Sequence, residues 1–529
     1  MRLRTMAAAA LGLAAAAFCQ TGDPRPRASR LRADLEFLCS DALAGRVSLG
    51  PGAEIAARYI AADFAKSGLR PGAGEGYLQP FPLVGYRGDP QKSILKLTRD
   101  GVTKAFHAGV DFAGSFPRRI EVKAPLVFAG YGITAPEYGY DDYANLDAAG
   151  KVVLVFDHEP QEDDPHSVFN GTGNTLHAGR QIKIANARRH GAAALLIASE
   201  PARLHAGLLE RAPRGASQGQ PMRAMAPTQA LDDPGQIPAF SVSDNVFAEL
   251  VASSGEKPTE LERAINVSLH PHSSALGNTV VELAAAPAEA TPGTSFNAAG
   301  LMEGSDPARE GETVLITAHY DHLGKQNGRL YPGANDNASG TVAVMELARL
   351  FAAARERPKR SLLFVVFGSE EESMLGSFYY TAHPLRPLEG TRAVINLDMI
   401  ARDERHIPQS EGVIEIPADT SNEVNLVGTY YSPDLERVIE RENQRVGLTL
   451  DTKFERDHAL NTLFRCDHLP FLAAGIPAVW LFGGFHPGYH EPVDTVEKLN
   501  FAKMEKVIRL AYGVAAEIAD TETGPRFGR

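Results

Sequence analysis

Residues of the types that bind divalent metals follow short apolar segments in the second half of the chain. They are His319, Asp336, Glu370, Glu371, Asp398 and one of the pair His486 and His490. Imidazole and carboxylate ligands without cysteine suit Zn²⁺, and Mn²⁺ or Co²⁺ would also fit. Two ions need a shared carboxylate, and Asp336 in the glycine-rich segment GANDNASG suits that position. The residues alone therefore predict a two-metal site and leave open which histidine contributes.

The elements that would position these residues alternate between apolar strands and helical patterns after Glu312. TVLITAH, SLLFVVF, AVINLD and PAVWLF have the pattern of buried strands, and GTVAVMELARLFAAA and PDLERVIERENQRVG that of helices. The alternation predicts an α/β fold with a mostly parallel sheet flanked by helices. In such sheets ligands bind at the carboxyl ends of the strands, where the candidate ligands lie. Asp321, two residues after His319, is placed to accept the second imidazole N–H and fix its tautomer.

Each of these residues taken alone also has an ordinary structural explanation. A histidine after a strand is usually a structural or surface residue, adjacent glutamates usually form a solvated charge run, and the Asp of GANDNASG would ordinarily mark a turn. Five such residues at or just beyond strand ends are hard to explain by coincidence. GASQG, at 215–219, matches a nucleophile elbow but has no strand before it, so it is discarded. A metal site is therefore the interpretation we favour.

The first half of the chain has a different pattern. From Leu31 to Leu83 apolar residues recur at helical spacing, in LRADLEFL and AEIAARYIAADFAKSGL. From Ala124 the short apolar runs APLVFAGYGI, GKVVLVFDH and AAALLIAS indicate a β-rich module with a helix or two. The segment AAAPAEATPGTS, 284–295, has the composition of a surface linker. The sequence thus divides into a helical start at 28–118, a β-rich module at 119–269 and an α/β part at 275–520.

Composition and the N-terminus restrict the partners and the location. A formal charge of −12 and a pI near 5.8 argue against nucleic acid, so a small molecule or peptide is the expected substrate. Residues 1–19 have the layout of a secretory signal peptide, with Arg2 and Arg4 before an apolar stretch too short to span a membrane. We expect export to the periplasm or the cell exterior, and favour cleavage over lipidation at Cys19. No later segment predicts a transmembrane helix, and nothing indicates the oligomeric state.

Five ordered motifs carry a resemblance to a known family. H-Y-D-H-L-G, G-A-N-D-N-A-S-G, E-E-E-S-M-L-G-S, N-L-D-M-I and Y-H-E-P-V-D-T resemble the co-catalytic zinc aminopeptidases related to the bacterial leucine aminopeptidases and the transferrin receptor. The resemblance covers about residues 295–515 and implies a zinc aminopeptidase-like, phosphorylase/hydrolase-like fold. The segment from APLVFAGYGI to IPAFSVS resembles the protease-associated (PA) domain that many members carry as an insertion. We expect this insert to contribute no metal ligand.

Carried over motif by motif, the resemblance implies a role for each candidate residue. His319 and Asp398 would bind one zinc, Glu371 and His490 the other, with Asp336 between them, Glu370 as general base and Tyr489 assisting the developing oxyanion. The H-E-P-V-D-T context selects His490 over His486. Ser373, Ala401 and Cys466 depart from the residues common in the family, but none replaces a metal ligand or a proton-transfer group.

The expected function is that of an exported enzyme with two Zn²⁺ ions, which removes residues from peptides that have a free N-terminus. One alternative is a metallocarboxypeptidase or dipeptidase, because the motifs specify hydrolysis and not the peptide end that is held. The other is a non-catalytic, receptor-like member, which should have lost metal ligands. Here all the ligands are present. The segment 402–425 matches the family poorly, so the preferred residue is not indicated.

Overall fold

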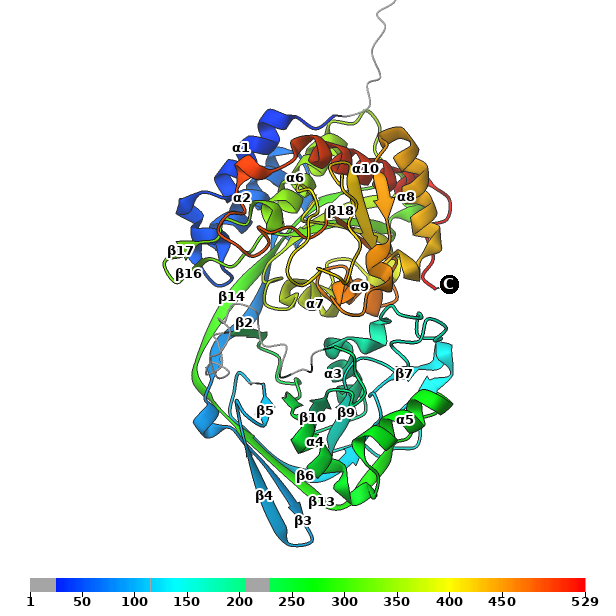
Figure 1. The fold of residues 1–529 in the computed structure, drawn as a ribbon. Coiled ribbons are helices and arrows are strands. Elements are labelled where there is room, and N and C mark those ends of the chain that lie inside the picture. Colours follow the sequence, from blue (N-terminus) through cyan, green and yellow to red (C-terminus); the bar gives the residue numbers. More distant parts are fainter. Residues whose placement is uncertain (1–24, 115, 206, 208, 210–227, 529) are drawn as a thin grey trace, which may run out of the picture.

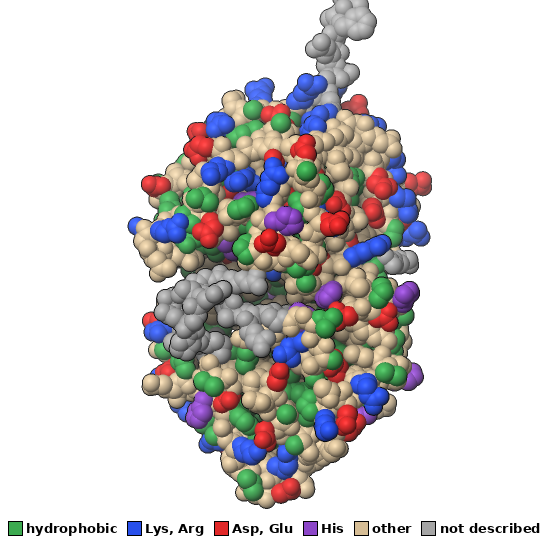
Figure 2. Space-filling view, viewed as in Figure 1, with side chains coloured by type: hydrophobic (Ala, Val, Ile, Leu, Met, Phe, Trp, Pro, Cys, Tyr) green, Lys and Arg blue, Asp and Glu red, His purple; other side chains and the backbone are tan. Residues whose placement is uncertain are grey.

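The computed structural model describes residues 25–114, 116–205, 207, 209 and 228–528, which form two lobes joined by long strands (Figure 1). The predicted signal segment 1–19, with Cys19, lies outside the described residues. Among the described helices, none has the length and apolar character needed to cross a membrane. Lys and Arg side chains are interspersed with Asp and Glu over both lobes on the face shown in Figure 2.

The upper lobe is built on a ten-stranded sheet in the described part of the chain. Four parallel strands form its centre, in the order β18 (Ser361–Phe367), β15 (Thr313–His319), β19 (Thr391–Asp398) and β22 (Ala478–Phe482). The neighbours on both sides are antiparallel to this centre: β14 (Pro287–Met302) beside β18, and β20 (Glu423–Val427) beside β22. The predicted α/β fold is therefore confirmed, and the strands that lead to the candidate ligands form the parallel centre of the sheet.

Helices cover both faces of this sheet, which explains why its central strands are apolar throughout. Along β15, Val314 and Ile316 face one core and Leu315 faces the other. The first core packs against α1 (Ala28–Leu38), α2 (Pro51–Lys66), α6 (Gly340–Ala352), α8 (Pro433–Val446) and α10 (Phe501–Asp520). The second core packs against α7 (Leu375–Ala382) and α9 (Leu469–Ala473).

The lower lobe contains an eight-stranded sheet in the described residues, as the β-rich pattern predicted. Its middle strands run parallel to one another: β6 (Ile120–Phe128), β9 (Val152–Phe156), β10 (Ala194–Ala198) and β12 (Ala239–Val242). Further strands extend it: β3 (Ile94–Arg99), β4 (Val102–His107), β5 (Phe112–Ala113) and β13 (Ser274–Ala285). The helices are α3 (Arg180–Arg189), α4 (Asp244–Val251) and α5 (Pro258–Ser268).

Two expectations from the sequence are wrong in the segments that join the lobes. Residues 78–83 are not helical but begin β2 (Leu78–Gly88), where Phe81 and Leu83 alternate with exposed residues and two prolines exclude a helix. The supposed linker 284–295 consists of the end of β13 and the first half of β14, which pairs with β2 from Pro287 to Ala298. Most side chains of its first half are exposed, so its composition resembles that of a loop.

Candidate metal centre

The central parallel strands bring the predicted residues to one edge of the upper sheet. His319 is the last residue of β15 and Asp398 the last of β19, and Glu370 and Glu371 follow the end of β18. Asp336 lies in the irregular turn Ala334–Ser339, directly before α6. Because the strands are parallel neighbours, their carboxyl ends converge, and segments far apart in sequence meet at one place.

The first group of side chains surrounds Nε2 of His319. This nitrogen lies 3.5 Å from Oδ1 of Asp336, 3.6 Å from Oδ2 of Asp398 and 3.7 Å from Oε2 of Glu370. Nε2 of His319 and Oδ1 of Asp398 are buried and have no hydrogen-bond partner among the described residues. These distances exceed those of ordinary hydrogen bonds. They suit a shared ion, because ligand atoms about 2.0–2.2 Å from a tetrahedral zinc lie about 3.4 Å apart.

The second group meets the other oxygen of Asp336. Nε2 of His490 lies 3.0 Å from Oδ2 of Asp336 and 3.2 Å from Oε2 of Glu371. Nδ1 of His322 lies 2.6 Å from Oε1 of Glu371 and 4.0 Å from Oδ2 of Asp336. The two oxygens of Asp336 thus face two different groups of ligand-type atoms, as a carboxylate shared by two ions would.

Backbone hydrogen bonds hold these turns in position. The carboxylate of Asp321 accepts the N–H of Glu370 at 3.0 Å and that of Glu371 at 3.3 Å. Nδ1 of His319 is 3.3 Å from the carbonyl oxygen of Asp321 and 3.7 Å from its carboxylate. Asp321 therefore lies between β15 and the turn after β18, where it orients the two glutamates as well as the imidazole.

Charge in the centre is unbalanced without cations. Burial raises the pKa of Glu370 well above its ordinary value, and the carboxylates of Asp467, Glu371 and Asp398 raise it further. Burial lowers the pKa of His319, but the carboxylates of Glu370 and Asp398 outweigh this effect and raise it well above normal. Four carboxylates in a buried site require compensating positive charge, since an unpaired buried charge is costly. The donor set therefore fits divalent metal ions.

The remaining predicted residues lie beside these groups. The ring of Tyr489 stacks on that of His490 with centroids 3.9 Å apart, and burial raises the pKa of its phenol to about 12. Tyr489 lines a cavity of about 20 Å³ together with the ligand-type carboxylates and Arg465, which is room for one water molecule. His486 is elsewhere: its ring nitrogens contact Nδ2 of Asn335 at 3.0 Å and the N–H of Gly488 at 3.1 Å. The geometry thus brings His490 to the carboxylates.

Sequence reasoning missed several side chains that complete the centre. His322 belongs to the motif H-Y-D-H-L-G, so its spacing from His319 was a usable signal. Asp494, in H-E-P-V-D-T, accepts the N–H groups of Asn335 and Asp336 at 2.8 and 3.1 Å. Cys466 is a buried free thiol that donates to Oδ2 of Asp398 at 3.0 Å, a contact no local pattern predicts.

Comparison with known proteins agrees with this architecture. Residues 297–515 match peptidase family M28, and residues 122–250 match the PA domain. Aminopeptidase YwaD of Bacillus subtilis is 28% identical over 246 residues, which are 44% of this chain and 47% of that protein. A probable zinc metalloprotease of Pyrenophora tritici-repentis is 27% identical over 265 residues, 45% of this chain and 50% of that protein. The chain thus spans about half the length of these relatives.

Among solved structures, an aminopeptidase from Aneurinibacillus sp. strain AM-1 aligns over 96% of this chain and 95% of its own, with 22% identity and a TM-score of 0.49. The M28 match lies in the segment that forms most of the upper sheet, and the PA match covers the parallel strands of the lower sheet. Residues 297–515 are thus similar to peptidase family M28 and residues 122–250 to the PA domain, as the sequence motifs indicated.

Proposed function

We propose that this protein is an exported, two-zinc aminopeptidase that hydrolyses N-terminal residues from peptides. The observation that carries the proposal is the position of Asp336, whose two oxygens face His319 and His490 separately. The names of the M28 relatives, an aminopeptidase and a zinc metalloprotease, support the reaction and the metal. The signal-like segment 1–19 supports export. We also propose that the inserted module spans 119–269, with β3, β4, β5 and β13 completing its sheet from the flanking segments.

The ligands divide into two sets around the shared carboxylate. His319 and Asp398 would hold one ion, Glu371 and His490 the other, and Asp336 would contact both. When bound, the ion pair would lower the pKa of a water molecule and polarise the scissile carbonyl. Zinc suits this set of nitrogen and oxygen donors, as would manganese or cobalt.

Glu370 is the proposed general base. Its carboxylate lines the cavity but lies outside both metal-binding sets, His319 with Asp336 and Asp398, and His322 with Asp336 and Glu371. Its backbone N–H is fixed by Asp321. Glu370 would take the proton of the attacking water and return it to the leaving amine. The phenol of Tyr489, which keeps its proton because its pKa is raised, would donate to the oxyanion that develops on the carbonyl.

An anionic cavity favours a substrate with a free α-amine. Glu370 and Asp398 line it and would attract the ammonium group. Arg465 lines the same cavity, which favours a second candidate function, a carboxypeptidase or dipeptidase that pairs the guanidinium with a substrate carboxylate. Its Nε already donates to the carbonyl of Leu460 at 2.8 Å, so we rank this second.

A panel of substrates separates these functions. Leucyl and alanyl nitroanilides, N-acetylated peptides and peptides with an amidated C-terminus would be assayed with and without a chelator. We expect cleavage of the free-amine substrates, loss of turnover on N-acetylation and loss of activity with the chelator. Hydrolysis of N-acetylated peptides from the C-terminal end would favour the carboxypeptidase, and the absence of hydrolysis in the zinc-loaded protein would favour a non-catalytic member.

A further inference from the structure

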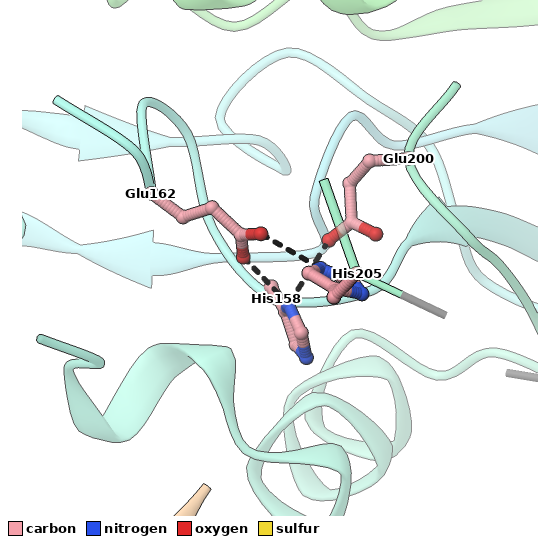
Figure 3. Close-up of side chains that lie close together, drawn as sticks. All are labelled: His158, Glu162, Glu200 and His205. Atoms are coloured by element: carbon pink, nitrogen blue, oxygen red, sulfur yellow. Dashed lines mark hydrogen bonds and ion pairs between the residues drawn. The ribbon is translucent and has the colours of Figure 1, made fainter. Parts of the chain in front are cut away.

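A separate group of side chains of the types that bind metals lies in the lower lobe, called the PA lobe from here on because it contains the PA-domain match. β9 and β10 are parallel neighbours, and Phe156 at the end of one pairs with Ala198 at the end of the other. The chain beyond these two ends supplies His158 and Glu162 after β9, and Glu200 and His205 after β10. Figure 3 shows that the four side chains converge. Their placement repeats, in the second sheet, the arrangement of the candidate centre in the first.

Ligand-type atoms of the four side chains lie close together. Nδ1 of His158 lies 2.5 Å from Oε2 of Glu162 and 3.6 Å from Oε1 of Glu200, and Nε2 of His205 lies 2.7 Å from Oε1 of Glu162. One ligand-type atom from each residue falls within 4.8 Å of all the others. The ligand atoms of a tetrahedral zinc lie about 3.4 Å apart. Small rotations of the four side chains would bring their ligand atoms to this spacing.

Glu200 provides an independent observation that points to a ligand. Its side chain faces the other three residues and is only 4% exposed, yet neither carboxylate oxygen has a hydrogen-bond partner among the described residues. Buried polar atoms in folded proteins nearly always have such a partner, because leaving them unpaired costs about 1–3 kcal/mol, and more for a charged group. A cation held between the four side chains would satisfy both oxygens.

The electrostatics of the surroundings also favour a cation. A third carboxylate lies next to the group, since Oδ2 of Asp157 is 3.7 Å from Nε2 of His158. An adjoining pocket of about 520 Å³ gives solvent a route to the group. Acidic residues line this pocket, against a single arginine among its lining residues, and they include Glu159, Asp163, Asp164 and Glu262. Such a lining concentrates divalent cations near the group.

We propose that His158, Glu162, Glu200 and His205 form a metal site of their own, which binds a divalent transition-metal ion of the Zn²⁺ type. Two imidazoles and two carboxylates make a complete four-ligand set, which is typical of a structural site rather than a catalytic one. The ion would tie the loop after β9 to the chain after β10. The proposal replaces the expectation that the insert holds no metal ligand, and it does not depend on the proposed function.

The bound ion would also stabilise a contact between the lobes. The loop that contains Glu162 continues through Asp163, whose carboxylate lies 3.3 Å from Nε2 of His458 in the upper lobe, called the catalytic lobe from here on after its proposed function. Nδ1 of the same histidine lies 2.8 Å from the carbonyl oxygen of Thr172. Since Asp163 directly follows a proposed ligand, occupancy of the site would hold the surface that packs against the catalytic lobe.

Metal counting on the full-length protein tests the site. Wild type, a His158→Gln/Glu200→Gln double variant and a Glu262→Gln control would be saturated with Zn²⁺, freed of excess metal and analysed by mass spectrometry. We expect the double variant to hold one equivalent fewer than wild type. The control should match wild type, because Glu262 lines the pocket but lies outside the four-residue group. Equal zinc content in the double variant and wild type would overturn the proposal.

A second measurement avoids any dependence on the variants folding. A crystal of the zinc-saturated wild-type protein, measured at the zinc absorption edge, should show an anomalous peak enclosed by the four side chains. The loss of one equivalent in the variant together with this peak would establish the site. A crystal without the peak would show that the group is a protonated histidine–carboxylate network, and would refute the proposal whatever the variants bind.

Discussion

The pair His322 and His490 gives the sharpest test of the candidate centre, since both contact Glu371. Nδ1 of His322 lies 2.6 Å from Oε1 and Nε2 of His490 lies 3.2 Å from Oε2 of the same carboxylate. His490 also reaches Oδ2 of Asp336 at 3.0 Å, whereas His322 is 4.0 Å away. We therefore expect His490 to be a ligand, and His322 to donate an N–H that orients the carboxylate of Glu371.

The two roles predict different losses of zinc binding when each histidine is replaced. His322→Ala removes a partner of a ligand, a change that typically lowers metal affinity about 10–100-fold. With about 1.4 kcal/mol for each factor of ten, this is a loss of about 1.4–2.8 kcal/mol at one of the two ions. His490→Ala removes a ligand itself and should lower the zinc content by one equivalent relative to wild type. His322→Asn, which keeps an N–H donor, should recover part of the affinity.

Competition with a zinc-binding dye would measure the affinity of the weaker ion in each variant, and mass spectrometry the zinc content. The reasoning fails if His322→Ala loses a full equivalent while His490→Ala keeps it, because His322 would then be the ligand. It also fails if His322→Ala binds both ions as tightly as wild type. Thermal unfolding of each zinc-loaded variant would show that the losses do not come from misfolding.

Three further predictions concern the proton acceptor, the shared carboxylate and the insertion. Glu370→Gln should lower kcat by about 10²–10⁴-fold at unchanged zinc content, and activity within tenfold of wild type would reject it as the base. Asp336→Ala should lose both ions of the centre, so zinc content two equivalents below wild type is expected, and retention of both would reject the bridge. Deleting residues 90–285 and joining the ends by a short turn should leave the catalytic lobe able to bind two zinc ions, because the N–H of Asp89 donates to the carbonyl of Ala286 at 3.1 Å. A deletion variant that unfolds cooperatively yet binds no zinc would contradict this last prediction.

The centre could be predicted from the sequence where ligand position follows from strand position. His319 and Asp398 end buried strands, and Glu370 and Glu371 directly follow one. The pattern of apolar runs predicts those strands, and the parallel arrangement then brings their carboxyl ends together. Asp336 could be predicted for another reason, since a glycine-containing turn before a helix is recognisable from the local sequence. These residues could therefore be predicted without knowing which strands are neighbours in the sheet.

The strands that connect the two lobes could not be predicted, because the pairing that holds them joins residues far apart in the sequence. The first half of β14 is rich in alanine and proline and largely exposed, so it lacks the alternation that identifies a strand. It is held by pairing with β2, about two hundred residues earlier in the chain. Pro292 is tolerated because β14 pairs there on one side, and its pairing with β18 begins only at Ala298.

The segment 455–466 of the catalytic lobe contacts both the PA lobe and the centre. The carbonyl of Glu455 accepts from Nδ2 of Asn170 in the PA lobe at 3.0 Å, and the thiol of Cys466 donates to Asp398 at 3.0 Å. Between them, the carboxylate of Asp457 accepts the N–H of Leu460 at 2.8 Å, which keeps the segment folded on itself. Arg465, in the same segment, lines the cavity. Every proposed ligand of the two ions comes from the catalytic lobe. We therefore expect the PA lobe to affect the fit of the substrate through this segment, and not the binding of the two ions.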